Sequence, residues 1–195
     1  LMEGAAHPYI IQIRGFNGFL FTRYSTKEED WREHSIFNYR LAEIKNIVFQ
    51  NPENPEQSWL LKNPDNRNFE LFSLHNNKII ENIDTMRVLE YLGSFGNVKF
   101  EIFLNEMEQN IKDSIINSQP WHIMTITDVY GKTSTIKTFH KRANQGEEDY
   151  EGNPILWDRD RLYALVNNEE DFVMIQFFIF DRILRPIDYF RKDDN

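Results

Sequence analysis

The chain of 195 residues contains no cysteine. Thiol catalysis, disulfide bonds and zinc sites with thiolate ligands are therefore excluded together. A chain of this length can bury a sizeable hydrophobic core, so its fold does not depend on covalent cross-links. The lack of cysteine is also compatible with a location outside the cytoplasm.

Positive charge is in short supply as well. The chain holds 22 Lys and Arg against 31 Asp and Glu, which gives a formal net charge of −9. Its basic residues are scattered, with no run longer than two, whereas phosphate contacts require clustered Lys and Arg. Nucleic acid is thereby excluded as a partner, and anionic membrane surfaces are disfavoured. No apolar run approaches the roughly 18 residues of a membrane span.

Motifs for catalysis and nucleotide binding are missing. The sequence contains no GxSxG, GxxxxGK[ST] or GxGxxG pattern, and the nearest glycine pattern, GFNG, lacks the lysine of a phosphate-binding loop. The five histidines are isolated from one another and show no metal-ligand spacing, so we interpret them as ordinary structural residues. These are His7, His34, His75, His122 and His140. We expect no cofactor and no catalytic residues.

Aromatic residues, in contrast, are abundant. The chain has 16 Phe, 8 Tyr and 4 Trp, and 41% of its residues are hydrophobic. This composition excludes intrinsic disorder. Most of the rings are expected in the core, and the remainder are available for a surface that binds a partner.

Two segments alternate clearly between apolar and polar residues and predict antiparallel hairpins. In residues 58–74 an Asn-Pro-Asp-Asn turn separates two strands, with one face formed by Trp59, Leu61, Phe69, Leu71 and Ser73. In residues 121–142 a Tyr-Gly turn separates two strands, with Met124, Ile126 and Asp128 on one face. Further strands are expected at residues 8–13, 42–49, 98–104 and 162–166.

Helices are expected in four places. Residues 82–96 predict a helix with Asp84 as N-cap, and Gly96 is placed to end it in a left-handed conformation. Residues 26–33 predict a short helix capped by Thr26, and residues 105–116 an amphipathic one. Residues 168–184 combine a cap at Asn168 with strand-forming side chains, and we favour a helix there.

These elements predict an α+β fold, a mainly antiparallel sheet of hairpins with two or three helices packed on one face. Tyr9 and Tyr163 lie in similar strand-turn segments, which indicates either a tandem repeat of a smaller α/β unit or chance similarity. On the repeat interpretation, residues 1–41 are the tail of an upstream unit and residues 42–195 a complete domain.

The stretch DYEGNPILWDRDRLYALV concentrates oxygen donors and raises the question of a cation site. The five donors are Asp149, Glu151, Asn153, Asp158 and Asp160. The first three alternate around Gly152, as in a calcium loop. Residues 154–157 interrupt the series, however, and Arg159 and Arg161 are available to neutralise the last two acids. We therefore favour a polar turn leading into an ion-paired strand.

Several segments together resemble an uncharacterised Bacteroidetes family of membrane-anchored cell-envelope proteins. They are PYIIQIRGFNGFLFTRY, EEDWRE, AEIKNIVF, PEQSWLL, DSIINSQPWHIMTITDVYGK, DYEGNPILWDRDRLYALV and DFVMIQFFIFDRILRPIDYF. The family carries a domain of unknown function, related to domains found beside auxiliary components of ABC transporters and gliding-motility components. The resemblance implies an extracytoplasmic location and an N-terminal membrane anchor upstream of Leu1. It implies no catalytic residues.

We therefore expect a non-catalytic envelope module that binds another envelope protein, such as a transporter-associated one, or assembles with itself. Its interaction surface is predicted to include Phe16, Phe19 and Trp31. Two alternatives stay open: a ligand- or cation-binding domain that uses residues 149–160, and a hydrolase with an unrecognised site.

Overall fold

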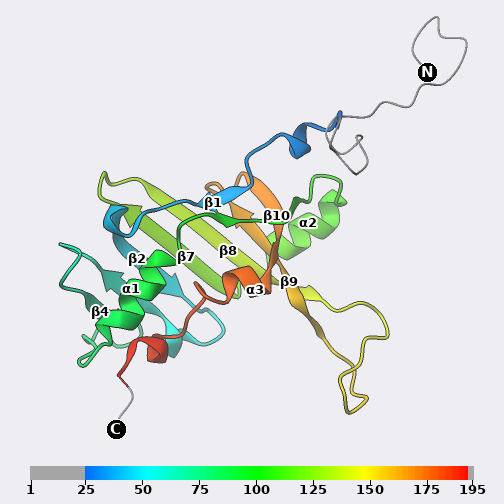
Figure 1. Ribbon diagram of the computed structural model, residues 1–195. Helices are drawn as coiled ribbons and strands as arrows, with labels where there is room; N and C mark the ends of the chain where they lie inside the picture. The colour runs from blue at the N-terminus through cyan, green and yellow to red at the C-terminus, as the bar shows by residue number, and fades with distance from the viewer. Residues whose placement is uncertain (1–24, 193–195) are drawn as a thin grey trace, which may run out of the picture. The chain divides into compact units, whose positions relative to one another are not determined.

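The computed structural model describes residues 25–192, and the chain divides into two units, residues 1–33 and 34–195 (Figure 1). The described part of the first unit contains one 3-10 turn, η2 (Glu28–Asp30), where we expected a short helix capped by Thr26. The predicted cap is wrong: Lys27 occupies the N-cap position, and its N–H donates to the Ser25 hydroxyl at 3.1 Å. The strand expected at residues 8–13 lies outside the described residues.

The second unit is built on an eight-stranded antiparallel sheet. Its strands are β2 (Ile44–Gln50), β3 (Trp59–Lys62), β4 (Glu70–Ser73), β6 (Ile102–Phe103), β7 (His122–Asp128), β8 (Thr133–Arg142), β9 (Trp157–Val166) and β10 (Asp171–Gln176). They lie in the order β4-β3-β2-β7-β8-β9-β10-β6. Two further strands, β1 (Ser35–Phe37) and β5 (Val98–Lys99), form a small separate sheet.

The route of the chain explains this order. Strands β2, β3 and β4 form one meander, and β7 to β10 form a second, joined to the first where β2 pairs with β7. Between the meanders the chain passes through helix α1 (Thr85–Gly93), adds β6 beside β10 at the opposite edge, and forms helix α2 (Gln109–Ile116). Helix α3 (Phe177–Phe180) and the 3-10 turn η5 (Ile187–Phe190) end the described chain. Two further 3-10 turns are η3 (Leu41–Glu43) and η4 (Pro55–Gln57).

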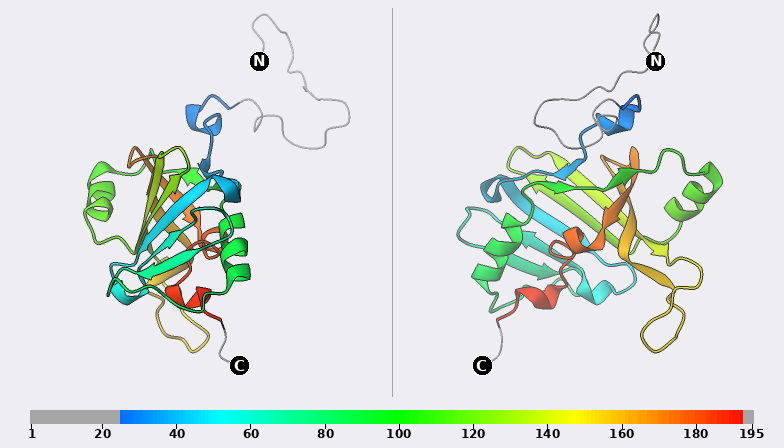
Figure 2. Two further views of the ribbon diagram at one scale, coloured as in Figure 1. Left: turned by 90° about the vertical axis from the view of Figure 1, so that its left-hand side faces the viewer. Right: turned by 45° about the vertical axis from the view of Figure 1, so that its right-hand side comes forward.

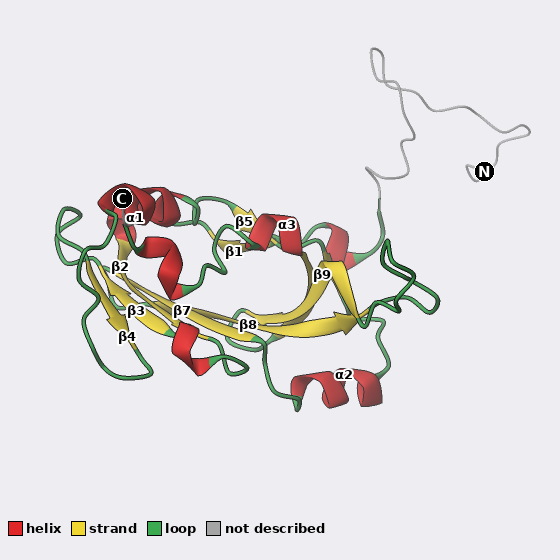
Figure 3. Ribbon diagram, turned by 90° about the horizontal axis from the view of Figure 1, so that it is seen from below, coloured by secondary structure: helices red, strands yellow, loops and turns green. Residues whose placement is uncertain are grey.

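The helices lie on both faces of the large sheet. Helices α1 and α3 cover one face, which we call the inner face, and α2 lies against the other, the outer face (Figures 2 and 3). The main core lies on the inner face and includes residues from α1, η5 and both sheets. Among residues 25–192, the hydrophobic residues fully buried on the outer face are Phe139, Leu165 and Phe172, and no residue of α2 is buried. The predicted α+β class is confirmed; two of the three helices share a face, and the tandem repeat stays a prediction.

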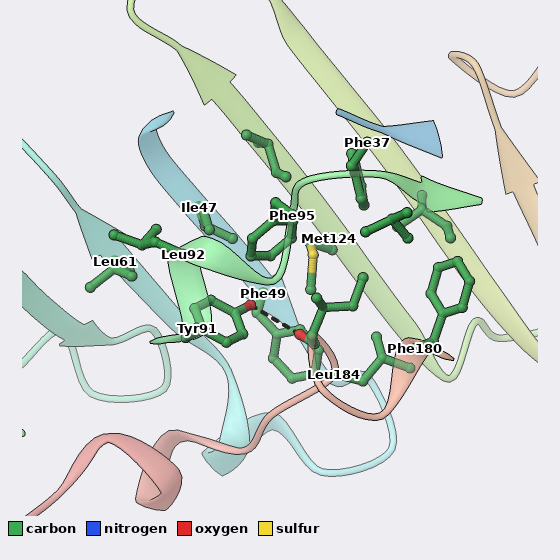
Figure 4. Close-up of a cluster of buried hydrophobic side chains, with 14 of the residues drawn as sticks. Phe37, Ile47, Phe49, Leu61, Tyr91, Leu92, Phe95, Met124, Phe180 and Leu184 are labelled. Carbon is green, nitrogen blue, oxygen red and sulfur yellow. Dashed lines mark hydrogen bonds between the residues drawn. The ribbon is translucent and has the colours of Figure 1, made fainter. Parts of the chain in front are cut away.

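Trp59 stands at the centre of an aromatic cluster in the inner core. It stacks on Phe49, with a centroid separation of 5.4 Å, and meets Tyr91 and Phe190 edge-on at 5.6 and 5.0 Å. Its indole N–H donates to the Arg185 carbonyl at 3.0 Å, and the Tyr91 hydroxyl donates to the Ile183 carbonyl (Figure 4). Burial raises the pKa of Tyr91 far above its ordinary value, so this hydroxyl remains a donor.

Both predicted hairpins are confirmed. In β7 the side chains of His122, Met124, Ile126 and Asp128 are buried, as the alternation predicts. Helix α1 begins at Asp84, whose carboxylate accepts the N–H groups of Met86 and Arg87. Its end differs from the prediction, because Asn97 and not Gly96 takes the left-handed conformation, with φ of 68°.

Two other predictions are wrong in an instructive way. Residues 98–104 form two short strands in two different sheets, β5 beside β1 and β6 beside β10. Residues 171–176 form strand β10 where we favoured a helix, because they pair with β9 and β6 on either side. The proposed helix cap is instead a tight turn in which Asn167, Asn168 and Glu169 all have positive φ. Within the segment 168–184, where we favoured a helix, the α-helix α3 spans only four residues.

Candidate functional site

A large bulge in β9 sets the geometry of the candidate site. His140 lies opposite Leu162 and Arg142 opposite Trp157, so residues 158–161 face Lys141 alone. The Asp158 carboxylate holds this bulge: one oxygen accepts the N–H groups of residues 160 and 161, at 2.8 and 2.9 Å. The other oxygen accepts from the Lys141 ammonium at 2.7 Å. Asp158 is thus a structural residue that fixes the start of β9.

Electrostatics agree with this role. Burial by itself would raise the pKa of Asp158, but the hydrogen bonds from Lys141 and from the two backbone N–H groups outweigh burial and lower it. Both side chains of the pair are largely buried, with 16% and 11% of the Lys141 and Asp158 side chains exposed. Lys141 and Asp158 therefore neutralise each other within the fold.

Residues 143–156 form a hairpin arm that projects from the ends of β8 and β9 (Figures 1 and 2). Backbone bonds join its two sides, from Ala143 N–H to the Leu156 carbonyl and from Ile155 N–H to the Glu147 carbonyl. Asp149 closes its turn by accepting the N–H groups of residues 151 and 153, both at 2.9 Å. The hydrogen bonds from Asn153 are the main reason that the pKa of Asp149 is lowered.

At the base of the arm, rings from three parts of the chain stack in sequence. The His140 imidazole lies between the indoles of Trp121 and Trp157, with centroid separations of 4.3 and 4.8 Å. Its Nε2 lies 3.2 Å from a carboxylate oxygen of Glu53. Trp121 also contacts His122 at 4.2 Å.

His122 extends this stack toward the core. Its ring lies 5.3 Å from that of Phe49, the residue that stacks on Trp59. Burial lowers the pKa of His122 to about 4, and the neighbouring His140 adds to the effect. His122 is consequently neutral at pH 7, and its Nδ1 lies 3.2 Å from the Thr138 hydroxyl. An unbroken run of six rings, which we call the aromatic run, joins the buried Trp59 to the surface.

An apolar groove of about 490 Å³ opens beside the outer end of the aromatic run. Its lining is Trp121, His140, Asp149, Pro154, Ile155, Leu156, Trp157, Asp158, Arg159, Leu162 and Phe177. Leu156 and Trp157 remain 59% and 39% exposed, so the wall of the groove presents apolar surface to water. A second groove, of about 530 Å³, shares Trp157 and His140 and is otherwise lined mainly by α2.

The predicted oxygen donors are distributed over this region without converging. Asp149, Glu151 and Asn153 lie in the arm, where Asp149 is bonded to its own turn, and Asp158 and Asp160 belong to the bulge. Within residues 25–192, no group of three or more His, Cys, Asp or Glu is arranged to hold a metal ion. We expected Arg159 and Arg161 to pair with Asp158 and Asp160. In the structure Asp158 pairs with Lys141 instead, and Arg161 pairs with Glu101 at 2.9 Å.

The predicted interaction residues are only partly placed. Phe16 and Phe19 lie outside the described residues. Trp31, in the first unit, is 69% exposed, and its indole N–H donates to the Ser25 carbonyl at 2.9 Å.

Sequence reasoning missed the groove, because its rings come from residues about 20 positions apart. Two signals were present. Trp121 follows the polar stretch Asn117–Gln119, and the apolar run Pro154–Trp157 interrupts an acidic stretch.

Comparisons with protein-family models, with curated proteins and with solved structures find no match to this chain. None of the helices formed by residues 25–192 combines the length and apolarity needed to cross a lipid bilayer.

Proposed function

We propose that the protein is a non-catalytic module of the cell envelope, and that its groove receives an apolar segment of another protein. The observation that carries the proposal is the exposed aromatic wall of the groove at the base of the arm. The envelope location, the upstream membrane anchor and a transporter-associated partner rest on the family resemblance in the sequence. They belong to the same proposal.

The groove has the properties of an interface centre. Tryptophan and tyrosine are enriched among residues that dominate binding energy, and here Trp157 and the fully exposed Tyr150 lie at the groove and on the arm. The aromatic run supports the groove from beneath, because each ring is packed against the next down to the buried Trp59. A preformed site of this kind loses little conformational entropy when it binds.

The ionisable groups around the groove support binding over catalysis. Asp158 is engaged by Lys141 and the backbone, and Asp149 by its own turn. His140 is enclosed between two indoles with Glu53 at its Nε2. Each group therefore already has a structural task.

Site-specific photocrosslinking in cells tests the proposal. The full-length protein would carry a photoreactive amino acid at Leu156, in the groove, or at the exposed Tyr130, in the turn between β7 and β8 at the opposite end of β8. We expect a defined protein adduct from position 156 and none from position 130.

The adduct must then be reproduced with the purified partner, and Trp121→Ala should abolish it. Equal adducts from both positions, or no adduct from position 156, would count against the groove as a protein-binding site.

A further inference from the structure

We infer that the partner segment is basic as well as apolar, with large apolar side chains in the groove and lysines or arginines along the acidic arm. The inference rests on the proposed function and adds to it the chemistry of the partner. Its observation is the juxtaposition of an apolar groove with an arm whose charges are all of one sign.

The groove supplies the apolar half of this recognition. A volume of about 490 Å³ lies within the range of sites that enclose small molecules or large side chains. Its wall exposes the ring of Trp157 and the side chain of Leu156, so apolar groups of a partner would remove both from water.

The arm supplies the charged half. Residues 143–156 contain Glu147, Glu148, Asp149 and Glu151 and no basic residue. The three glutamates are exposed.

Nearby basic groups leave this charge largely intact. Lys141 is engaged with Asp158, and Arg161 with Glu101. Arg142 and Arg159 line the grooves at the base of the arm. Even with these two included, and with Asp158 left out because it pairs with Lys141, residues 142–160 hold five carboxylates against two arginines. The field over the arm is therefore negative and attracts cations.

The same charge argues against two other occupants. A second copy of this chain would bring another acidic arm, on a protein with a net charge of −9, toward the first. An anionic lipid surface would be repelled for the same reason. A basic segment of a different protein gains from both halves of the site.

Peptide binding to the purified protein tests the inference, followed through tryptophan fluorescence. The probes are a peptide with a Phe-Leu-Phe centre flanked by lysines, a version flanked by glutamates, and a lysine version in which alanines replace the centre. We expect the first to bind, with an affinity that falls as salt is raised, and the other two to bind at least about tenfold more weakly.

Matched variants separate the two halves of the site. Glu147→Gln, Glu148→Gln and Glu151→Gln combined should weaken the lysine peptide about tenfold and remove most of its salt dependence. The control combines Glu70→Gln, Glu81→Gln and Glu90→Gln, which changes the net charge equally at exposed positions near β4 and α1, and should leave the affinity unchanged. Trp157→Ala should weaken binding while the salt dependence persists.

Equal binding of lysine and glutamate peptides, or equal effects of the two triple variants, would overturn the inference. Photocrosslinking from Leu156 could still succeed in that case, so the proposed function would stand. Absence of binding by every peptide would likewise overturn the inference, and photocrosslinking would decide the function separately.

Discussion

Trp59 and Trp157 lie at opposite ends of the aromatic run and differ in their burial and in their contacts. Trp59 has no exposed surface, contacts three rings and satisfies its indole N–H with the Arg185 carbonyl. Trp157 is 39% exposed, and His140 is its one ring contact within the described residues. At the buried end of the run, which we call the closed end, Trp59 makes all its contacts within the fold. At the exposed end, the open end, part of the Trp157 ring remains accessible to a partner. Stability should therefore depend on the first and binding on the second.

The largest effect is expected at the closed end. Trp59→Ala removes the centre of the inner aromatic cluster and leaves a cavity, so we expect the free energy of unfolding to fall by about 4 kcal/mol. Denaturant titration measures this loss. Trp31→Ala is the control, because Trp31 is mostly exposed, and should change stability by less than about 0.5 kcal/mol. Similar losses for the two variants would contradict the proposed difference in burial.

Midway along the run, His122 makes stability depend on pH. Its pKa in the folded protein is lowered to about 4 from an ordinary value of 6.5. As pH falls below 6.5 the unfolded chain binds a proton at this site and the folded chain does not, so folding is disfavoured until pH 4, where the dependence ends. We expect a loss of up to about 3 kcal/mol across this window.

Unfolding titrations between pH 4 and 8 measure this dependence. In His122→Gln, the free energy of unfolding should lose the part of its pH dependence between pH 6.5 and 4 that His122 contributes. Above pH 7, His122 should contribute no pH dependence in the unsubstituted protein either. An unchanged slope in the variant would show that His122 is not the source of the pH dependence.

The bulge that follows Trp157 depends on Asp158. Asp158→Ala removes three hydrogen bonds and leaves the mostly buried Lys141 without its partner, so we expect a loss of about 2 kcal/mol. Asp160→Ala, in the same acidic motif but exposed, should cost less than about 0.5 kcal/mol. Thermal melting of both variants decides the matter, and equal losses would argue against the structural role of Asp158.

The smallest effect is expected from calcium. The Asp149 carboxylate is already bonded to the arm's own N–H groups, and the five oxygen donors do not converge. Added calcium should leave the melting temperature unchanged, and a chelator should do the same. A calcium-dependent rise would restore the cation-binding alternative, because a ligand that binds only the folded state stabilises it.

Local patterns predicted much of the fold. The hairpins β3–β4 and β7–β8 and helix α1 were expected, because alternation and an N-cap at Asp84 are properties of neighbouring residues. Strand β10 was not, because the Asn and Glu residues that suggested a helix cap form instead the tight turn of a hairpin with β9, and the other edge of β10 pairs with β6, about 70 positions away. Non-local pairing of this kind leaves little trace in a single sequence.

The candidate site was harder to predict for the same reason. The polar turn at Asp149 was expected from its own stretch, and the structure shows that turn. The groove depends on the register between β7, β8 and β9, which brings Trp121, His140 and Trp157 into one stack. The register was not available from periodicity, because the bulge after Trp157 shifts it by several residues.

Trp157→Ala, studied in the full-length protein for both stability and partner binding, tests the central claim most directly. We predict that the free energy of unfolding falls by only about 1 kcal/mol, the value of an aromatic contact with His140, while the photocrosslink from Leu156 is lost. A loss of stability as large as that of Trp59→Ala would mean that the open end of the run is structural. An undiminished photocrosslink would mean that partners bind elsewhere.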